Sequence, residues 1–452
     1  MASKLFGNSN RSKFGGERPV SQHSGSERDA EKQKKRRKTR SRLRPLKVIL
    51  SILLVLEILY CIAIFSNIPF VKELREIYIK TAMSTMNHQW LATAFIPSDI
   101  INELVEAGEQ AKQEQLGVNS SWDNVNDVTE APTKNTAPTE APTGGPAEPD
   151  ETTEPPITQE QIDFFARFDE IDEESMLAYV DEHPEAVADG WDKIYINEAG
   201  LDDEGTSIRT TADDQVLAID AENEILLIRV RGSGILGDYR GILAIAKDPA
   251  RLSLGVSKDI GSRGQRAGEI AERYDAHIAI TASGFDDPNG GGNGGRVAGG
   301  CMSDGEVYGT RFRGSYKRIE LHEDNRLYVM DSYMGYSDDC TDASEFWPAL
   351  VVDGKNALSK NHFFTEMNPR ACLGQTRDEE ILFLVIEGRF LDCVGTDADE
   401  CVDILLRYDC YQGMNMDGGT SAIMWYDGEY VTRCSNERLP EGRLMPNAWI
   451  YK

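Results

Sequence analysis

The chain has 452 residues, of which 27% are charged, and its formal net charge at pH 7 is −28. That length is enough for two or three domains with a substantial buried core. The charge is unevenly divided, because residues 1–47 hold 15 Lys and Arg against 4 Asp and Glu, which leaves −39 on the rest. Such an acidic body repels phosphate backbones, which excludes nucleic acid as a main partner.

A long apolar segment separates the basic tail from the acidic body. Residues 48–65 (VILSILLVLEILYCIAIF) contain one charge, Glu57, and apolar residues continue to Val71. At about 1.5 Å per residue, the segment is just long enough to cross a hydrocarbon core of roughly 30 Å. The Lys- and Arg-rich run before it favours a cytoplasmic tail 1–47, an anchor 48–71 in the cell membrane and an extracellular body. A cleaved signal peptide is disfavoured because the polar leader exceeds forty residues.

Three short regions follow the predicted anchor. Residues 72–127 show apolar residues at helical spacing and predict a membrane-proximal helical segment. Residues 128–156 repeat variants of Thr-Glu-Ala-Pro-Thr, a composition that cannot bury a core, so we expect a disordered Pro/Thr-rich stalk that sets the reach of the body. Residues 157–188 are interpreted as a short helical lead-in.

The remaining residues, 189–452, form the predicted exterior domain. Apolar runs separated by Gly and Asp turns predict strands, for example at 224–230, 277–282 and 381–386. Helical patterns interrupt them near 265–274 and 402–408. Because several strands are apolar on both faces, we expect a sheet that is covered on both sides. The predicted fold class is mixed α/β (α+β), with a twisted mixed sheet flanked by helices.

Seven cysteines lie beyond the predicted anchor, which permits at most three disulfides in an oxidising exterior. Cys393 and Cys401 flank an acidic loop and are a plausible pair. The sequence has no C-x-x-C motif or His cluster, so no structural zinc is expected, and His277 is interpreted as a core residue that opens a strand. Acidic clusters such as Asp286-Asp287 could bind Ca²⁺, but solvated turns are the favoured interpretation, and no cofactor is expected.

Three polar stretches are candidates for chemistry. Glycines in residues 282–296 allow backbone N–H groups to converge on an anion, although an ordinary surface loop has the same composition. Arg370 begins an apolar strand, where its guanidinium could clamp a phosphate or form an ordinary ion pair. In Asn415-Met-Asp-Gly-Gly-Thr-Ser421 the glycines allow the polar side chains to enter one cavity, although a tight turn capped by Asp417 is equally consistent with the sequence.

The region from 232 to 452 resembles the phosphodiester glycosidase family. Matching segments occur in family order at residues 281–285, 347–354, 370–374, 387–389, 415–421 and 442–447. The Asn-x-Asp-Gly-Gly-x-Ser signature at 415–421 is the specific one, and the others support it. The resemblance implies hydrolysis of a sugar-1-phosphodiester, with an envelope glycopolymer or exopolysaccharide as the expected carbohydrate substrate.

Three residues depart from the family pattern: Thr281 replaces an Asn, Gly284 replaces an aromatic residue and Glu387 replaces an Asp. If those side chains act directly in catalysis, substrate choice or activity has shifted. A membrane-tethered, non-catalytic module that binds glycopolymer therefore remains the alternative, and turnover of a sugar-1-phosphodiester distinguishes the two. A serine hydrolase using Ser421 is disfavoured because no G-x-S-x-G elbow surrounds that residue.

The implied chemistry assigns a role to each candidate residue. Phosphate is already a good leaving group, so stabilising its negative charge matters more than a strong general acid. We expect Arg370 and the Gly-rich loop to bind phosphate, with Arg443 in reserve. Asp417 is the candidate base or nucleophile, and Asn415 and Ser421 orient sugar hydroxyls or water. The remaining expected substrate contacts are Ser283, Asn293, Gly294, Arg296, Gly418, Gly419, Thr420 and Arg389.

Overall fold

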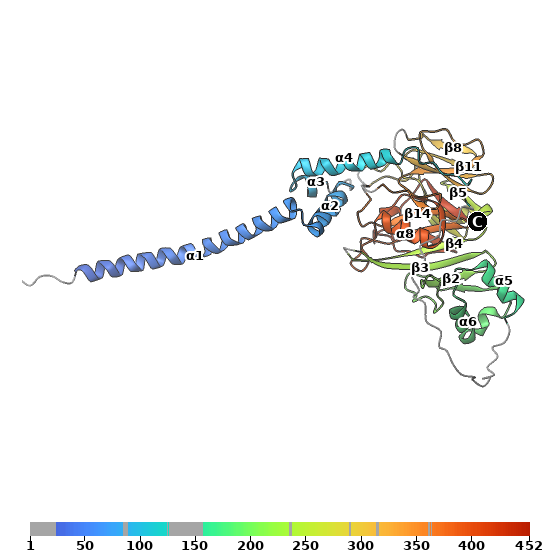
Figure 1. Cartoon of the computed structure of the whole chain (residues 1–452), viewed down its shortest axis with the longest axis horizontal. Helices are drawn as coiled ribbons and strands as arrows, with labels where there is room; N and C mark the ends of the chain where they lie inside the picture. The colour runs from blue at the N-terminus through green and yellow to red at the C-terminus, as the bar shows by residue number, and fades with distance from the viewer. Residues whose placement is uncertain are drawn as a thin grey trace, which may run out of the picture. The chain divides into compact units, whose positions relative to one another are not determined.

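The computed structural model describes residues 24–84, 89–123, 125, 157–234, 237–288, 291–312, 316–359, 362 and 364–452 (Figure 1). The chain divides into two compact units, Met1–Arg75 and Glu76–Lys452. The predicted linker 128–156 lies outside the described residues, and so do residues 1–23 of the predicted basic tail.

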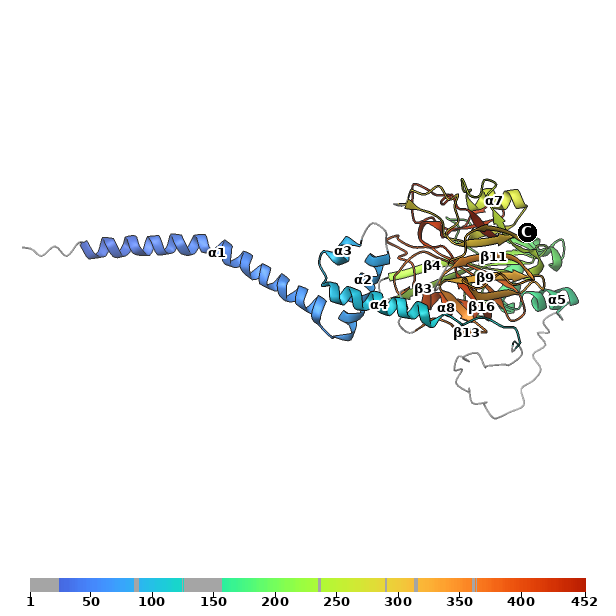
Figure 2. The ribbon, with the colours of Figure 1, turned by 90° about the horizontal axis from the view of Figure 1, so that it is seen from above.

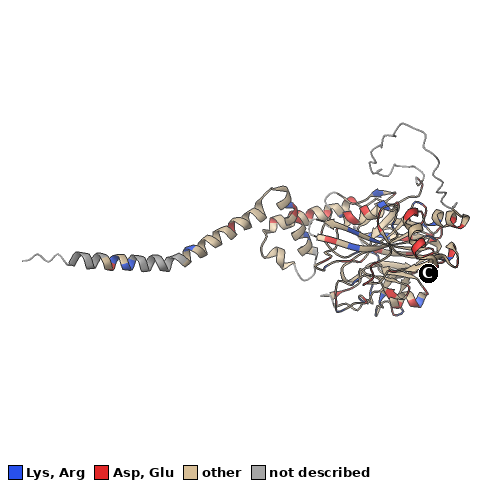
Figure 3. Ribbon diagram, turned by 90° about the horizontal axis from the view of Figure 1, so that it is seen from below, with Lys and Arg blue, Asp and Glu red and all other residues tan. Residues whose placement is uncertain are grey.

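The first unit is dominated by one long helix, α1 (Ser24–Phe65). Its segment Pro45–Phe65 has 21 residues with a mean hydropathy of 2.9, and it is the one stretch of the described chain long and apolar enough to cross a membrane. Figure 3 shows this part of the helix almost free of charged residues. The helix ends six residues before the predicted boundary at Val71, and Pro69 begins α2 (Pro69–Ser84), a position that suits proline because its missing N–H has no helical partner there.

Short helices follow in the membrane-proximal segment, as its periodicity predicted. They are α3 (Trp90–Thr93) and α4 (Ser98–Glu114), with α2 before them. The lead-in folds as α5 (Gln159–Arg167) and α6 (Glu173–Glu182). Thr158 and Gln161 form a reciprocal capping box at the start of α5, which satisfies two backbone donors that a helix N-terminus leaves free.

Three sheets build the second unit, and every strand pairing found among its described strands is antiparallel. In spatial order, the nine-stranded sheet contains β1 (Tyr195–Asn197), β2 (Gln215–Asp220), β3 (Ile225–Gly234), β4 (Gly237–Ala246), β15 (Ile381–Ile386), β14 (Arg370–Thr376), β16 (Cys410–Asn415), β12 (Ala349–Val352) and β13 (Lys355–Asn356). The α+β class is confirmed, but the single mixed sheet was wrong.

Each smaller sheet has five strands. One contains β10 (Leu327–Asp331), β9 (Lys317–His322), β11 (Cys340–Phe346), β7 (Gly300–Ser303) and β8 (Glu306–Gly309). The other contains β18 (Glu429–Tyr430), β17 (Met424–Tyr426), β6 (Ile278–Thr281), β19 (Asn447–Tyr451) and β5 (Leu252–Val256). Two helices in this region, α7 (Ala267–Tyr274) and α8 (Ala398–Arg407), confirm the predicted helical stretches.

The nine-stranded sheet is buried on both faces, as its apolar strands predicted. In β15, Leu382 and Leu384 pack with residues of α5, α6 and α8, whereas Phe383 and Val385 pack against the smaller sheets. Figure 2 shows these layers from above. The lead-in helices therefore belong to the domain core, and residues 157–188 are not a separate approach to it.

Residues 115–125 attach α4 to the sheets of the second unit. The Gln115 side chain donates to the carbonyls of Ala349 and Ala357 at 2.9 and 2.8 Å, and the Trp122 indole N–H donates to the Leu327 carbonyl at 3.0 Å. Ser120 exchanges hydrogen bonds with Val329, so this segment covers the edge of β10.

This attachment corrects the predicted stalk. Residues 76–125 and 157–452 belong to the same compact unit. The Pro/Thr-rich segment thus connects two parts of one body, and its length does not set the distance between that body and α1.

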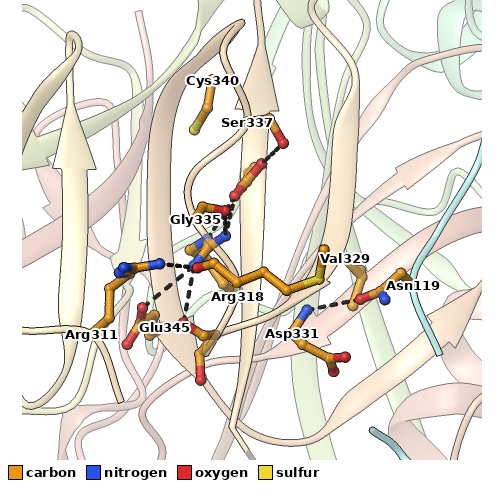
Figure 4. Close-up of polar contacts among 12 residues, drawn as sticks. Asn119, Arg311, Arg318, Val329, Asp331, Gly335, Ser337, Cys340 and Glu345 are labelled. Carbon is orange, nitrogen blue, oxygen red and sulfur yellow. Dashed lines mark hydrogen bonds and ion pairs between the residues drawn. The ribbon is translucent and has the colours of Figure 1, made fainter. Parts of the chain in front are cut away.

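A buried ion pair holds the attachment in place. Lys317 and Asp331 are both fully buried, with 2.7 Å between the Nζ and Oδ1 atoms. The same ammonium donates to the Val118 carbonyl at 2.7 Å, while Asp331 accepts from the Gly117 N–H at 2.8 Å. The Asn119 side chain accepts from the Asp331 N–H (Figure 4). Burial lowers the pKa of Lys317, and Asp331 opposes that effect by stabilising the charged form.

A second buried network lies beside this pair on β9 and β11. The Arg318 guanidinium pairs with Glu320, and its Nη1 atom lies 3.7 Å from Glu345 (Figure 4). Glu345 accepts hydrogen bonds from the backbone N–H groups of Gly300 at 3.0 Å and Phe312 at 2.7 Å. The network thereby fixes the loop that carries Phe312.

The seven cysteines beyond residue 71 are free thiols, and all are buried. The predicted Cys393–Cys401 pair does not form, because Cys401 in α8 lies against Cys372 of β14, which raises its pKa together with burial. His277 is also not a core residue: its side chain is 28% exposed and lies 3.7 Å from Asp427.

We predict that Lys317→Met strongly destabilises the second unit, because it leaves the Asp331 carboxylate buried without a cation. The expected loss in free energy of unfolding is about 3–5 kcal/mol. Arg266→Met is the matched control, since it removes an exposed ion pair with Glu441 and should cost under about 1 kcal/mol. Chemical denaturation of both variants measures the difference, and equal losses would contradict the assigned role of the buried pair.

Candidate active site

One cavity of about 950 Å³ lies at the ends of β14 and β16. Charged, amide and hydroxyl side chains and aromatic rings line it together. The polar and charged lining residues are Thr81, Asp287, Glu366, Asn368, Arg370, Arg389, Asn415, Asp417, Thr420, Ser421, Asn436 and Arg443. The cavity therefore brings together the Asp-Gly-Gly signature and the Arg370 motif, which are distant in the sequence.

The signature forms a tight knot directly after β16. The Asp417 N–H donates to the Ala282 carbonyl at 3.1 Å, and the Asn415 side chain donates to the Trp347 carbonyl at 3.0 Å. Glycine is required in the turn: Gly419 has φ +62°, and a Cβ on Gly418 would lie 2.9 Å from the Pro369 carbonyl oxygen.

Asp417 is the carboxylate at the centre of the cavity wall. Burial raises its pKa to about 6, while the Ser421 hydroxyl and the charge of Arg443 act to lower it. A carboxyl group with such a pKa changes its charge near neutral pH. It can therefore accept or deliver a proton, or attack as an anion, under ordinary conditions.

Arg370 lies in the floor of the cavity and is 4% exposed. Its guanidinium donates to the carbonyls of Thr396 at 3.1 Å and Glu366 at 2.8 Å, and it lies 3.5 Å from the Glu366 carboxylate. Most of its hydrogen-bonding capacity is thus already used by the protein.

Glu366 is a second carboxylate in the cavity lining. Its side chain is buried, its Oε2 atom has no hydrogen-bond partner among the described residues, and burial raises its pKa despite the charge of Arg370. An unpartnered buried carboxylate oxygen is costly for stability, so such groups often serve a site.

Two further arginines reach the cavity, and they differ in availability. Arg443 is neutralised by Asp287 through two hydrogen bonds of 2.6 and 2.7 Å. Arg389 donates to the Asn368 side chain at 3.0 Å and lies against Gly419, and it makes no ion pair with the described residues. Desolvation and the nearby Arg370 lower the pKa of Arg389. Among the three arginines, Arg389 is therefore the most available to an anion.

Aromatic rings form the remaining wall of the cavity. Trp347 and Phe364 lie with their ring centroids 4.3 Å apart, and Phe312 and Tyr316 stack at 3.9 Å. Gly284, the residue that replaces a family aromatic, faces another ring: a Cβ there would lie 3.0 Å from Phe346. Phe346 from β11 thus occupies space beside this glycine.

Four predicted contacts in the Gly-rich loop lie outside the cavity lining described above. Ser283 is buried and bonds Asn447, and Asn293 donates to the Ser262 carbonyl. Gly294 packs on the backbone of Leu444, and Arg296 lines a separate small cavity. The loop contributes Asp287 instead, through its pairing with Arg443.

Two of the departures from the family pattern also lie away from the cavity lining. Thr281 is fully buried in β6. The Glu387 carboxylate accepts hydrogen bonds from Arg240 and Arg433, at 2.7 and 2.8 Å. Both positions are structural here, so neither departure changes the cavity lining directly.

The acidic clusters considered for Ca²⁺ have other partners. Asp287 binds Arg443, Asp397 caps α8, and Asp399 lies 2.9 Å from His362. One further acidic group gathers Asp169, Glu170 and Glu380, and the Lys247 ammonium lies among them, 2.7 and 2.6 Å from the two Glu carboxylates.

Comparison with known protein families gives one match. The model of the phosphodiester glycosidase family matches residues 274–452. This segment is similar to a phosphodiester glycosidase domain. The match confirms the resemblance seen in the sequence motifs and supports a hydrolase of phosphodiester-linked sugars.

One curated relative is an uncharacterised SPbeta prophage-derived protein, YomE, of Bacillus subtilis (strain 168). It is 25% identical over 178 residues, which cover 37% of this chain and 27% of the relative. The chain thus spans about a quarter of the length of that protein.

Solved structures with similarity include two more proteins. The zebrafish N-acetylglucosamine-1-phosphodiester alpha-N-acetylglucosaminidase catalytic domain, auto-inhibited by its pro-peptide, is 14% identical, with a TM-score of 0.42 over 50% of this chain and 82% of its own. A hypothetical protein from Synechocystis is 12% identical, with a TM-score of 0.36 over 54% of this chain and 65% of its own.

We predict that Asp417→Asn makes the protein more heat-stable than the wild type at neutral pH. Because the folded-state pKa of Asp417 is about 6, above the unfolded value of 3.8, wild-type stability falls as pH rises through that window. The difference in melting temperature should therefore grow between pH 4 and pH 7. Asp287→Asn is the opposite control: Arg443 lowers the pKa of Asp287, so this variant should melt lower across pH 5–7.5.

Proposed function

We propose that the second unit hydrolyses sugar-1-phosphodiesters, releasing the free sugar and a phosphomonoester. The observation that carries this proposal is the cavity in which an Asp of raised pKa lies with a guanidinium that has no carboxylate partner among the described residues. We further propose that α1 anchors this hydrolase in the cell membrane with the domain outside, and that its substrates belong to the envelope or to exopolysaccharide.

Arg389 binds the phosphate in this proposal. Cleavage of the anomeric C–O bond leaves both electrons of that bond on the phosphate oxygen, so negative charge develops there. A positioned guanidinium stabilises that charge more strongly in a partly desolvated cavity than in water. Arg370 and Arg443 add positive potential, although Glu366 and Asp287 already compensate their charges.

Asp417 acts at the anomeric carbon. In its ionised form it either removes a proton from the attacking water or attacks the carbon directly. Ser421 holds the carboxylate through its hydroxyl, and Asn415 is fixed by the Trp347 carbonyl at the base of the knot. Glycine at positions 418 and 419 allows the chain to bring these groups to one side.

Glu366 supplies the proton that the leaving phosphate takes up. Burial favours its neutral form, and the free Oε2 atom offers a position for that proton. Because a phosphate leaves readily, this contribution is smaller than the charge stabilisation by Arg389. The aromatic wall provides apolar faces for the sugar ring.

The second candidate, a non-catalytic module that binds glycopolymer, is favoured by the departure at Gly284, which lies in the cavity lining. Such a module would need the cavity but no titrating carboxylate. Turnover of any sugar-1-phosphodiester by the purified protein decides against it.

We predict that Arg389→Gln lowers kcat/KM for a sugar-1-phosphodiester by about 10²–10³-fold, since it removes charge stabilisation from the transition state. Asp417→Asn should abolish turnover. Wild-type kcat/KM should rise with pH through about 6 as Asp417 ionises. Arg296→Gln, outside the cavity, is the matched control and should retain wild-type rates. Unchanged rates in Asp417→Asn would refute the assigned role of that carboxylate.

A further inference from the structure

The lip of the cavity is formed by the helix that follows the apolar segment. Thr81 of α2 lines the cavity, and α2 begins at Pro69, shortly after α1 ends at Phe65. Along a helix, the rise from Pro69 to Thr81 is about 18 Å. The three-residue connection adds about 10 Å at full extension. The lip is therefore covalently held within about 30 Å of the end of the candidate membrane span.

The same helix is fixed to the cavity by a buried charge. The Lys80 ammonium, in a residue 7% exposed, donates to the His362 carbonyl at 3.0 Å. Burial lowers the pKa of Lys80, while Glu76, Glu366 and Asp399 act to raise it. Thr81 and Lys80 thus belong to the cavity structure.

Exposed aromatic side chains lie in the same helical region. Tyr78 is 44% exposed, Trp90 is 56% exposed and Phe95 is 58% exposed. The Tyr78 hydroxyl donates to the Leu91 carbonyl at 2.9 Å, which ties α2 to α3 (Figure 2). Trp and Tyr gather at membrane–water interfaces because their rings have an apolar body and a polar edge. Clustered exposed aromatics so close in sequence to a membrane-length helix are typical of an interfacial segment.

The interior of the cavity fits an amphipathic substrate. Arg389 offers a site for one phosphate, and Asp417 lies in the same lining. Phe312, Phe346 and Phe364 add an apolar wall, on which the face of a sugar ring and the first carbons of a lipid alcohol can both lie.

We propose that the natural substrate is a glycosyl phosphoryl lipid of the bilayer, in which one phosphate joins the anomeric carbon of a sugar to a lipid alcohol. This inference rests on the proposed hydrolysis and on α1 spanning the bilayer. The α2–α3 region lies in the interface and presents the cavity to the lipid headgroup. Water adds its hydroxyl to the anomeric carbon, the C–O bond breaks, and the lipid phosphate keeps the oxygen and takes up one proton. No other reactant is needed.

The test uses the full chain reconstituted in vesicles of phosphatidylethanolamine and phosphatidylglycerol. Paired probes carry glucose, galactose or N-acetylglucosamine as the α-1-phosphodiester of either decaprenol or methanol. Sugar release should be at least tenfold faster from the decaprenyl probe in the same vesicle than from the methyl probe at equal total concentration. Decaprenyl probe in separate vesicles should release little sugar, because the cavity reaches only its own bilayer.

Matched variants test the interfacial contact. The double variant Trp90→Ser/Phe95→Ser should lower release from the decaprenyl probe at least fivefold and leave the methyl probe unchanged. Tyr195→Ser, a surface aromatic that is 53% exposed in the edge strand β1, should change neither rate. Equal rates on both probes, with no effect of the double variant, would overturn the lipid substrate while leaving the hydrolase intact. Absence of release from every probe would overturn the proposed function itself.

Discussion

The buried pair between Lys317 and Asp331 holds residues 115–118 against the sheets of the second unit. Both side chains are fully buried, and the ammonium donates to the carbonyls of Gln115 and Val118. A buried ion pair is expensive to form and still more expensive to break, so it favours one arrangement over near alternatives. Through it, α4, which ends at Glu114, becomes part of the body that carries the cavity.

Of the three arginines that line the cavity, one has no carboxylate partner among the described residues. Arg443 and Arg370 each face a carboxylate, which compensates most of their positive charge. Arg389 instead faces an amide, at a backbone φ of +67° that few side chains adopt without cause. Local strain of this kind is found where a side chain must be aimed at a ligand. The partners in the cavity thus distinguish three guanidinium groups that look alike in sequence.

Local pattern predicted the fold well, and it predicted the site in part. Apolar runs and Gly–Asp turns indicated the strands, helical patterns indicated α7 and α8, and the glycine signature allowed Asp417 to enter a cavity as one of two equal interpretations. The pattern could not show which arginine is available to an anion. The guanidinium of Arg370 is occupied by hydrogen bonds to the Thr396 and Glu366 carbonyls, and only the folded structure shows these contacts. Glu366 lies only four residues before Arg370, yet an isolated Glu carries no signal of burial. The Gly-rich loop was wrongly predicted to bind phosphate, because glycine also allows two backbone segments to pack closely. Gly294 packs in this way on the backbone of Leu444.

Under the proposed anchoring of α1 in a membrane, the position of residues 126–156 has a consequence for release of the domain. In a protein held by a true stalk, one peptide-bond cleavage in the connector sheds the soluble part. Here both neighbours of that segment belong to the same unit, and the contacts of Lys317, Gln115 and Trp122 lie before it. A protease acting there would leave two fragments associated without a covalent link, and shedding would require a cut near residue 76.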